Sequence, residues 1–267
     1  MEDSIAIRGA RYVQQRALDG VAEVGRITML LGDTLRFLIP GLRSFRLVVQ
    51  QAHSIGVGSL GLVLVVSVFT GAVAAVQAAY QFSNVVPLKY LGSVILRSVI
   101  IELGPVLTAL VVGGRVGASV AAELGTMKVT EQIDALRAMG INPIRFLVVP
   151  RVVASTVMLP VVTVFANAIA IFGGFVVAVT TLDVSAHTFV TSLKQFFFMR
   201  DLFSGLFKSV IFGGIIGTMG SYYGFATEGG AEGVGAATTR AVVSSCVLVL
   251  ISDYVLAHVL FRFIFDS

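Results

Sequence analysis

The stretch that decides the fold is ELGTMKVTEQIDALRAMGINPIRFLVVPR, residues 123–151, a charged segment that lies between two hydrophobic ones. Apolar residues recur at helical spacing from Ile133 to Met139, and charged residues occupy the positions between them. Gly140 is a helix-ending signal, and the Asn-Pro dipeptide that follows predicts a turn. The pattern predicts an amphipathic helix over 128–140 that can dock a soluble partner. A polar loop that merely connects two spans is the alternative interpretation.

The composition indicates an integral membrane protein. Of the 267 residues, 56% are hydrophobic and 13% are charged, and the mean hydropathy is +0.93. Soluble domains carry roughly 25% charged residues. The single cysteine, Cys246, can form neither an internal disulfide nor a zinc site by itself.

The hydrophobic stretches predict an all-α fold with five transmembrane helices, because about 20 apolar residues are needed to cross the hydrocarbon core. A membrane domain is expected over 56–267. Its predicted spans cover residues 56–80, 93–121, 145–182, 202–225 and 239–263.

Two further helices are predicted outside the spans. Residues 1–55 mix apolar residues with a charged residue about every turn, which is typical of an interfacial, elbow-like helix at the membrane surface. A soluble helix packed on the protein's own surface is the alternative. A short helix is expected over 185–199, on the opposite side of the membrane.

The basic residues predict the orientation. Seven arginines lie within residues 1–55. Arg115, Lys128, Arg137, Arg145 and Arg151 lie between the second and third spans or in the facing ends of these spans. Because positively charged loops stay in the cytoplasm, the N-terminus and the 128–140 helix are expected there. Five spans then place the C-terminus on the outer side of the inner (cytoplasmic) membrane.

Several ionisable residues fall within or beside the predicted spans, where a charge costs about 2.5–3.5 kcal/mol on insertion scales. Glu102 should therefore have a basic partner, and Arg97 and Lys208 are the candidates by depth. Lys208 could instead extend its ammonium group toward the membrane surface. Asp253 is expected to contact either Arg240 or a polar group of another span.

Motifs for catalysis are missing from the sequence. There is no G-x-x-x-x-G-K-[ST] phosphate loop, so ATP hydrolysis is expected in a partner chain and not here. His53, His187 and His258 are isolated in the sequence and suggest no metal site. We therefore expect no catalytic residue, metal or cofactor in this chain.

The chain resembles the MlaE/YrbE family of permeases, which are the membrane subunits of MCE-associated ABC lipid transporters. The resemblance rests on ELGP at 102–105, GRVGA at 114–118, AELG at 122–125, Met127, TEQIDAL at 130–136, Met139-Gly140, Pro143, Pro150-Arg151, Gly235, ATTRAVV at 237–243 and Asp253-Tyr254. One position departs from the family pattern: Ile101 stands where members often have an arginine.

The resemblance implies an assembly around this chain. It implies a homodimer or a pair with a close paralogue, two cytoplasmic ABC ATPase subunits that bind ATP and Mg²⁺, and an MCE-domain ring on the outer side. Some systems add a small STAS-domain protein. The implied substrate is a phospholipid or a related hydrophobic lipid. The segment that couples to the ATPase would be the 123–151 stretch, with Glu123, Glu131, Gln132, Asp134, Arg137, Met139 and Arg151.

The dimer is expected to enclose a lipid-sized apolar cavity that opens toward the outer side, because the first span carries no charge whereas the costly Glu102 lies within the second. Its predicted lining includes the fifth span and Phe69, Val73, Val76, Gln77, Tyr80 and Glu102. Two other functions remain open: an ion-coupled secondary transporter with Glu102 and Asp253 as proton sites, and a membrane scaffold without transport.

Overall fold

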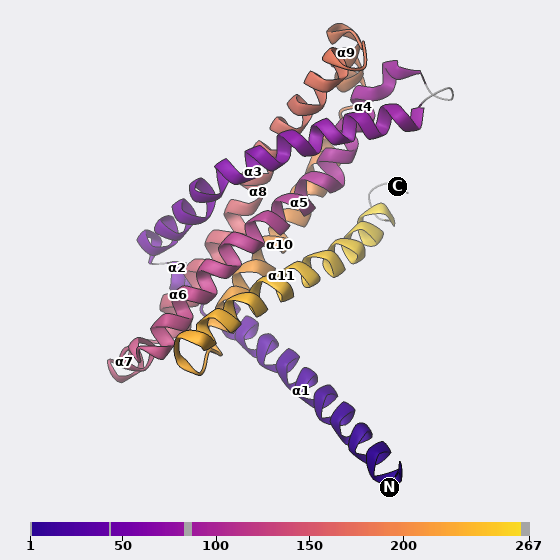
Figure 1. Ribbon diagram of the computed structural model, residues 1–267. Coiled ribbons are helices and arrows are strands. Elements are labelled where there is room, and N and C mark those ends of the chain that lie inside the picture. Colours follow the sequence, from indigo (N-terminus) through magenta and orange to yellow (C-terminus); the bar gives the residue numbers. More distant parts are fainter. Residues whose placement is uncertain (1, 43, 83–86, 263–267) are drawn as a thin grey trace.

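The computed structural model describes residues 2–42, 44–82 and 87–262, and the side chains of these except 2–17, 19 and 42. Every regular element in these ranges is helical (Figure 1). In chain order they are α1 (Glu2–Arg36), α2 (Leu38–Leu42), α3 (Phe45–Phe82), η1 (Leu88–Tyr90), α4 (Leu91–Ser98), η2 (Val99–Leu103), α5 (Gly104–Val112), η3 (Gly113–Gly117), α6 (Ala118–Val129), α7 (Gln132–Ala138), η4 (Ile144–Val148), α8 (Val149–Thr180), α9 (Ala186–Gln195), α10 (Met199–Phe225) and α11 (Gly230–Leu260).

Five helical stretches of the described chain are long and apolar enough to cross a membrane, which confirms the predicted number of spans. They cover Phe45–Phe82, Leu88–Val129, Ile144–Thr180, Met199–Phe225 and Gly230–Leu260. Most extend beyond the predicted bounds, because a hydropathy window finds the lipid-embedded part of a helix and not its ends. The first begins at Phe45, where the sequence predicted residue 56. The predicted end of the fifth, residue 263, lies outside the described residues.

The predicted 128–140 helix is wrong in its bounds. α6 continues the second span to Val129, and the chain then breaks at Glu131, whose φ of 58° is left-handed. α7 is a separate helix of seven residues. Because a left-handed residue cannot continue a right-handed helix, the break turns α7 out of line with the second span. The predicted 185–199 helix is likewise shorter, as α9.

The second span contains two π-helical segments, η2 and η3. η2 directly precedes the turn that contains Pro105. Proline lacks an N–H and crowds the preceding turn, so an inserted π-turn is one way to keep the helix continuous. Glu102 lies on η2, and its side chain is thereby offset from the register of an unbroken α-helix.

Close helix packing holds the bundle together. A Cβ atom at Gly71 of α3 would overlap the backbone of Ala170 in α8, and one at Gly213 of α10 would overlap the backbone of Ser155 in α8. In a membrane such backbone approach takes the place of the hydrophobic effect between helices. α8 is therefore the central helix, with α3 and α10 packed closely against it.

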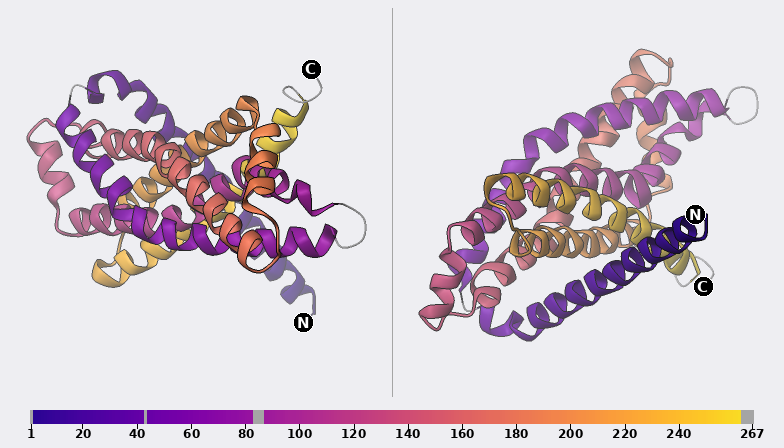
Figure 2. Two further views of the ribbon diagram at one scale, coloured as in Figure 1. Left: turned by 90° about the horizontal axis from the view of Figure 1, so that it is seen from above. Right: turned by 60° about the horizontal axis from the view of Figure 1, so that its bottom comes forward.

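α1 leaves the bundle at the end where α7 lies and extends outside it, whereas α4 and α9 lie at the opposite end (Figures 1 and 2). α1 is bound to α10, because Arg26 Nε donates to Tyr222 Oη at 3.2 Å and Tyr223 Oη donates to Glu23 Oε1 at 2.9 Å. Its other side exposes large apolar residues, namely Leu18, Val21, Val24 and Leu35. The helix thus packs on the protein along one face and leaves an apolar face uncovered.

Candidate functional sites

The first candidate site is α7 with the turns on either side of it. Ile133 is 0% exposed and anchors α7 to the core, whereas Met139 at its end is 66% exposed. Leu136 packs partly against the core. The predicted apolar face is therefore divided: Ile133 holds the helix in place, and Met139 remains free to contact another molecule.

Three charged residues of this site, Lys128, Asp134 and Arg137, lie at the surface and pair with one another. Asp134 Oδ2 lies 3.3 Å from Lys128 Nζ, and its Oδ1 lies 2.9 Å from Arg137 Nη1. Gln132 Nε2 donates to the Thr130 hydroxyl at 3.0 Å. Exposed ion pairs of this kind contribute little to stability, so substitution of these charged residues should change the stability of the fold little.

The base of the site is fixed to the spans. Arg151 is buried at the start of α8, and its Nη2 lies 3.0 Å from Glu123 Oε2 on α6. After α7, Gly140 takes a φ of 75°, and Asn142 Oδ1 accepts a hydrogen bond from the Ile144 backbone N–H at 2.9 Å. Of the predicted coupling residues, Glu123 and Arg151 therefore form a support, and the other five line the exposed segment.

The second candidate site is a cluster of charges within the spans. Lys208 on α10 is 1% exposed. Its Nζ donates to Glu102 Oε2 at 2.6 Å and to Asp253 Oδ1 at 2.9 Å. One ammonium group thus joins the second, fourth and fifth spans. The predicted pairing of Glu102 with Lys208 is confirmed, and the alternative in which Lys208 extends to the membrane surface is wrong.

Arg97 and Arg240, which were candidates to pair with Glu102 and Asp253, lie outside this cluster. Arg97 Nε lies 3.0 Å from Asp201 Oδ2, in a separate pair at the start of α10. Arg240 precedes Asp253 by thirteen residues on α11, which is about 20 Å along a helix axis. Pairing of Arg240 with Asp253 was therefore a wrong alternative. Asp201 was missed because the predicted fourth span began one residue after it.

Replacing Glu102 tests how the cluster works. Glu102→Gln keeps an oxygen that can accept from Lys208, so we expect only a mild loss of the transport activity that the family resemblance implies. Glu102→Lys places a second ammonium group against Lys208, and we expect it to abolish transport. Transport by equal amounts of the purified variants is the measurement. Full and equal activity of both variants would remove Glu102 from the mechanism.

The third candidate site is an apolar groove along α3. It has a volume of ≈ 620 Å³. Its lining is formed by Val65, Val66, Phe69, Thr70, Val73, Ala74, Gln77, Leu103 and Leu107. Val76 lines an adjoining hollow of ≈ 250 Å³, together with Val73, Gln77 and residues of α3 and α8. The groove therefore contains three of the predicted lining residues, and a fourth borders its extension.

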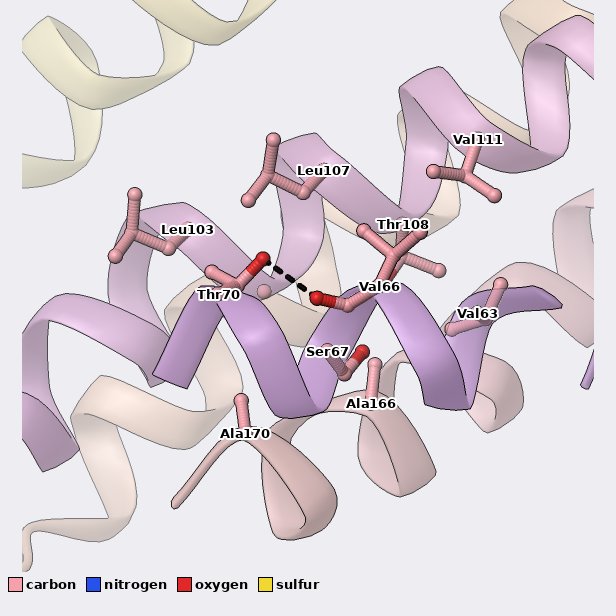
Figure 3. Close-up of a pocket in the computed structure, with 11 residues that line it drawn as sticks. Val63, Val66, Ser67, Thr70, Leu103, Leu107, Thr108, Val111, Ala166 and Ala170 are labelled. Atoms are coloured by element: carbon pink, nitrogen blue, oxygen red, sulfur yellow. Dashed lines mark hydrogen bonds between the residues drawn. The ribbon is translucent and has the colours of Figure 1, made fainter. Parts of the chain in front are cut away.

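Two predicted lining residues and one predicted span do not line the groove. Tyr80 is 83% exposed near the end of α3, and Glu102 precedes the lining residue Leu103. α11 contributes no side chain. A separate cavity lies on the inner side of the α3–α5 contact. Its volume is only ≈ 10 Å³, which is about enough for one water molecule. Figure 3 shows Leu103, Leu107 and Val111 around this space, with the Thr70 hydroxyl donating to the Val66 carbonyl at 2.9 Å.

Comparison with known proteins gives one consistent match. The family described as Permease MlaE matches residues 48–259. A probable ABC transporter permease protein of Rickettsia prowazekii is 42% identical over 253 residues, which are 95% of this chain and 98% of the relative. One of Rickettsia bellii is 38% identical over the same shares. The Arabidopsis thaliana protein TRIGALACTOSYLDIACYLGLYCEROL 1, chloroplastic, is 35% identical over 241 residues, which are 90% of this chain and 69% of that protein.

Proposed function

The chain belongs to the MlaE permease family and is the permease subunit of a transporter, and we propose that this transporter moves a phospholipid or a related hydrophobic lipid. The groove along α3 carries the proposal. Phe69 and Val73 are 67% and 62% exposed there, and Gln77 and Thr70 supply the main polar side chains of the lining. Such walls suit an acyl chain and offer little to a sugar or an ion. The name of the Arabidopsis relative contains that of a glycolipid, which also supports a lipid substrate.

The naming of the relatives as ABC transporter permeases implies an ATPase partner. In the proposed complex two ATPase subunits bind ATP and Mg²⁺ and contact α7 from the cytoplasm. The arrangement of α7 supports this contact with the ATPase. The buried Ile133 anchors the helix to the core, whereas Met139 and the charged residues project outward. A movement of the ATPase would reach the bundle through the Glu123–Arg151 pair at the base of the segment.

The rest of the proposed assembly follows the family resemblance. Two copies, or this chain and a paralogue, would form the permease, and an MCE-domain ring would lie on the outer side of the inner membrane. Some systems add a STAS-domain protein. α11 is the least buried of the five described spans and exposes Leu250, Ile251 and Tyr254, a face suited to a partner in the membrane. The N-terminus is placed in the cytoplasm and the C-terminus on the outer side.

A photo-crosslinker in the groove tests the lipid proposal. At Val73 we expect it to capture lipid that stays bound after detergent extraction, because the groove holds an acyl chain against α3 and α5. Mass spectrometry of the adduct is the measurement. Val157 of α8 is a matched control, since it is similarly exposed but lies outside the groove. Boundary lipid at Val157 is exchanged for detergent during extraction, so irradiation after extraction should give no lipid adduct there.

The same experiment at Tyr80 tests whether the lipid site extends to the end of α3. Crosslinks only to protein at both Val73 and Tyr80, with lipid captured at other positions, would contradict the groove as the lipid site. Co-purification of an ATPase with the chain, and stimulation of its activity by the chain, would separate the transporter complex from a membrane scaffold.

A further inference from the structure

A second, polar pocket lies at the other side of the molecule, between α1, α10 and α11. Its volume is ≈ 780 Å³, within the range of small-molecule sites. It is formed where α10 ends and α11 begins, at the end of the bundle where α7 lies (Figures 1 and 2). Both helices are membrane spans, so their ends lie at the depth of the lipid headgroups on that side. The groove along α3 shares no residue with this pocket.

The charges of the pocket have both signs. Arg26 and Arg240 line it together with Glu23, Asp33 and Glu228. The side chains of Arg240, Asp33 and Glu228 form no hydrogen bond or ion pair with any residue that the structure describes. One guanidinium group and two carboxylates in this pocket are therefore available to form hydrogen bonds and ion pairs with a ligand.

Two tyrosines hold the remaining charges in place. The buried Tyr222 accepts from Arg26 Nε at 3.2 Å. Tyr223 Oη donates to Glu23 Oε1 at 2.9 Å, and lies 2.8 Å from Ser244 Oγ. The α1 wall of the pocket is thus fixed against α10 before any ligand binds, which lowers the entropic cost of binding.

We infer that this pocket binds the phosphoethanolamine headgroup of a membrane lipid. Guanidinium groups bind phosphate oxygens, and carboxylates accept hydrogen bonds from a primary ammonium group. A purely anionic headgroup would meet three carboxylates, and a quaternary ammonium headgroup has no N–H to donate. Met29, Leu30 and Phe225 add an apolar wall for the glycerol and the first part of the acyl chains. The inference rests on the membrane-spanning fold and is independent of the substrate proposed for the groove.

The chain has no tryptophan, so a single substitution creates a unique fluorescent reporter. Met29→Trp places it on the pocket wall at an exposed position. The full chain would be reconstituted in phosphatidylcholine vesicles, and brominated phosphatidylethanolamine, phosphatidylcholine or phosphatidylglycerol would be added as quencher. We expect phosphatidylethanolamine to quench at a mole fraction about five-fold lower than the other two lipids, a preference of the size that partly exposed charge contacts give.

Two matched variants test whether the lipid preference depends on the charges of the pocket. With Arg240→Gln the preference should disappear, whereas with Arg262→Gln, just beyond the other end of α11, it should persist. A reporter introduced instead by Phe203→Trp, at an exposed position of α10 outside the pocket, should show no headgroup preference.

Three results would overturn the inference. Equal quenching of the Met29→Trp reporter by the three lipids would mean ordinary boundary lipid. A preference for phosphatidylethanolamine that is unchanged by Arg240→Gln would show that the charged residues of the pocket do not recognise the headgroup. Relief of quenching by millimolar inorganic phosphate, which has neither the ammonium group nor the acyl chains, would assign the pocket to a soluble anion instead of a membrane lipid.

Discussion

Lys208→Met is expected to destabilise the folded chain by about 3–5 kcal/mol and to abolish transport, the largest effect of any single substitution proposed for this protein. The ammonium group of Lys208 is buried and lies between Glu102 and Asp253. Without it, two carboxylates are left close together within the spans with no opposite charge. Thermal unfolding in detergent, followed by circular dichroism, is the measurement, and Lys194→Met on the exposed face of α9 is the matched control.

A triple variant separates a structural role from a functional one. Lys208→Met combined with Glu102→Gln and Asp253→Asn removes all three charges, and neutral replacement of a buried ionic cluster is often tolerated. We expect most of the stability to return. If the triple variant is stable and still transports nothing, the charges act in transport. A Lys208→Met variant that is as stable and active as the parent would contradict the cluster itself.

Reversing two charges near α7 should disconnect the chain from its ATPase. Glu131→Lys with Asp134→Lys is expected to weaken the association at least about ten-fold, because like charges across an interface cost several kcal/mol. The fold should survive, since the ion-pair partners that the structure describes for Asp134 are the surface residues Lys128 and Arg137. Co-purification of the ATPase and ATPase activity are the measurements.

The control for this variant is Lys194→Glu, a charge reversal on α9 at the opposite end of the bundle (Figure 1). It should leave the association unchanged. Full ATPase association and full transport with both Glu131 and Asp134 reversed would show that α7 is not the docking segment.

Much of the architecture could be predicted because hydropathy and helix signals are local. Five spans follow from the length of the apolar stretches, and the position of the exposed segment between the second and third spans follows from its charges. The break at Glu131 could not be predicted. Nothing in its neighbours requires a left-handed residue, and the apolar spacing continues through the break as if the helix were unbroken.

The polar cluster was predicted only in part, because a sequence gives the depth of a residue in a span but not the direction in which it points. Depth made Arg97 and Lys208 equal candidates as partners of Glu102. The π-turn at η2 offsets Glu102, and the rotation of α10 brings Lys208 to it, while Arg97 pairs with Asp201. An apolar groove does lie along α3, beside which the cavity was predicted, because a charge-free span must place its apolar side chains somewhere and α3 leaves many of them exposed. Enclosure of this groove by a dimer stays a prediction.

Reconstituted transfer tests most directly the proposal that this permease moves lipid with energy from ATP. Vesicles would hold the chain with the proposed ATPase and MCE-domain partners, and the appearance of labelled phospholipid in acceptor vesicles would be followed over time. We expect transfer that requires both the chain and ATP hydrolysis, and that falls about ten-fold with Val73→Asp, which places a charge in the apolar groove. Transfer that proceeds without ATP and follows an imposed proton gradient would contradict the proposal and favour an ion-coupled transporter that uses Glu102 and Asp253.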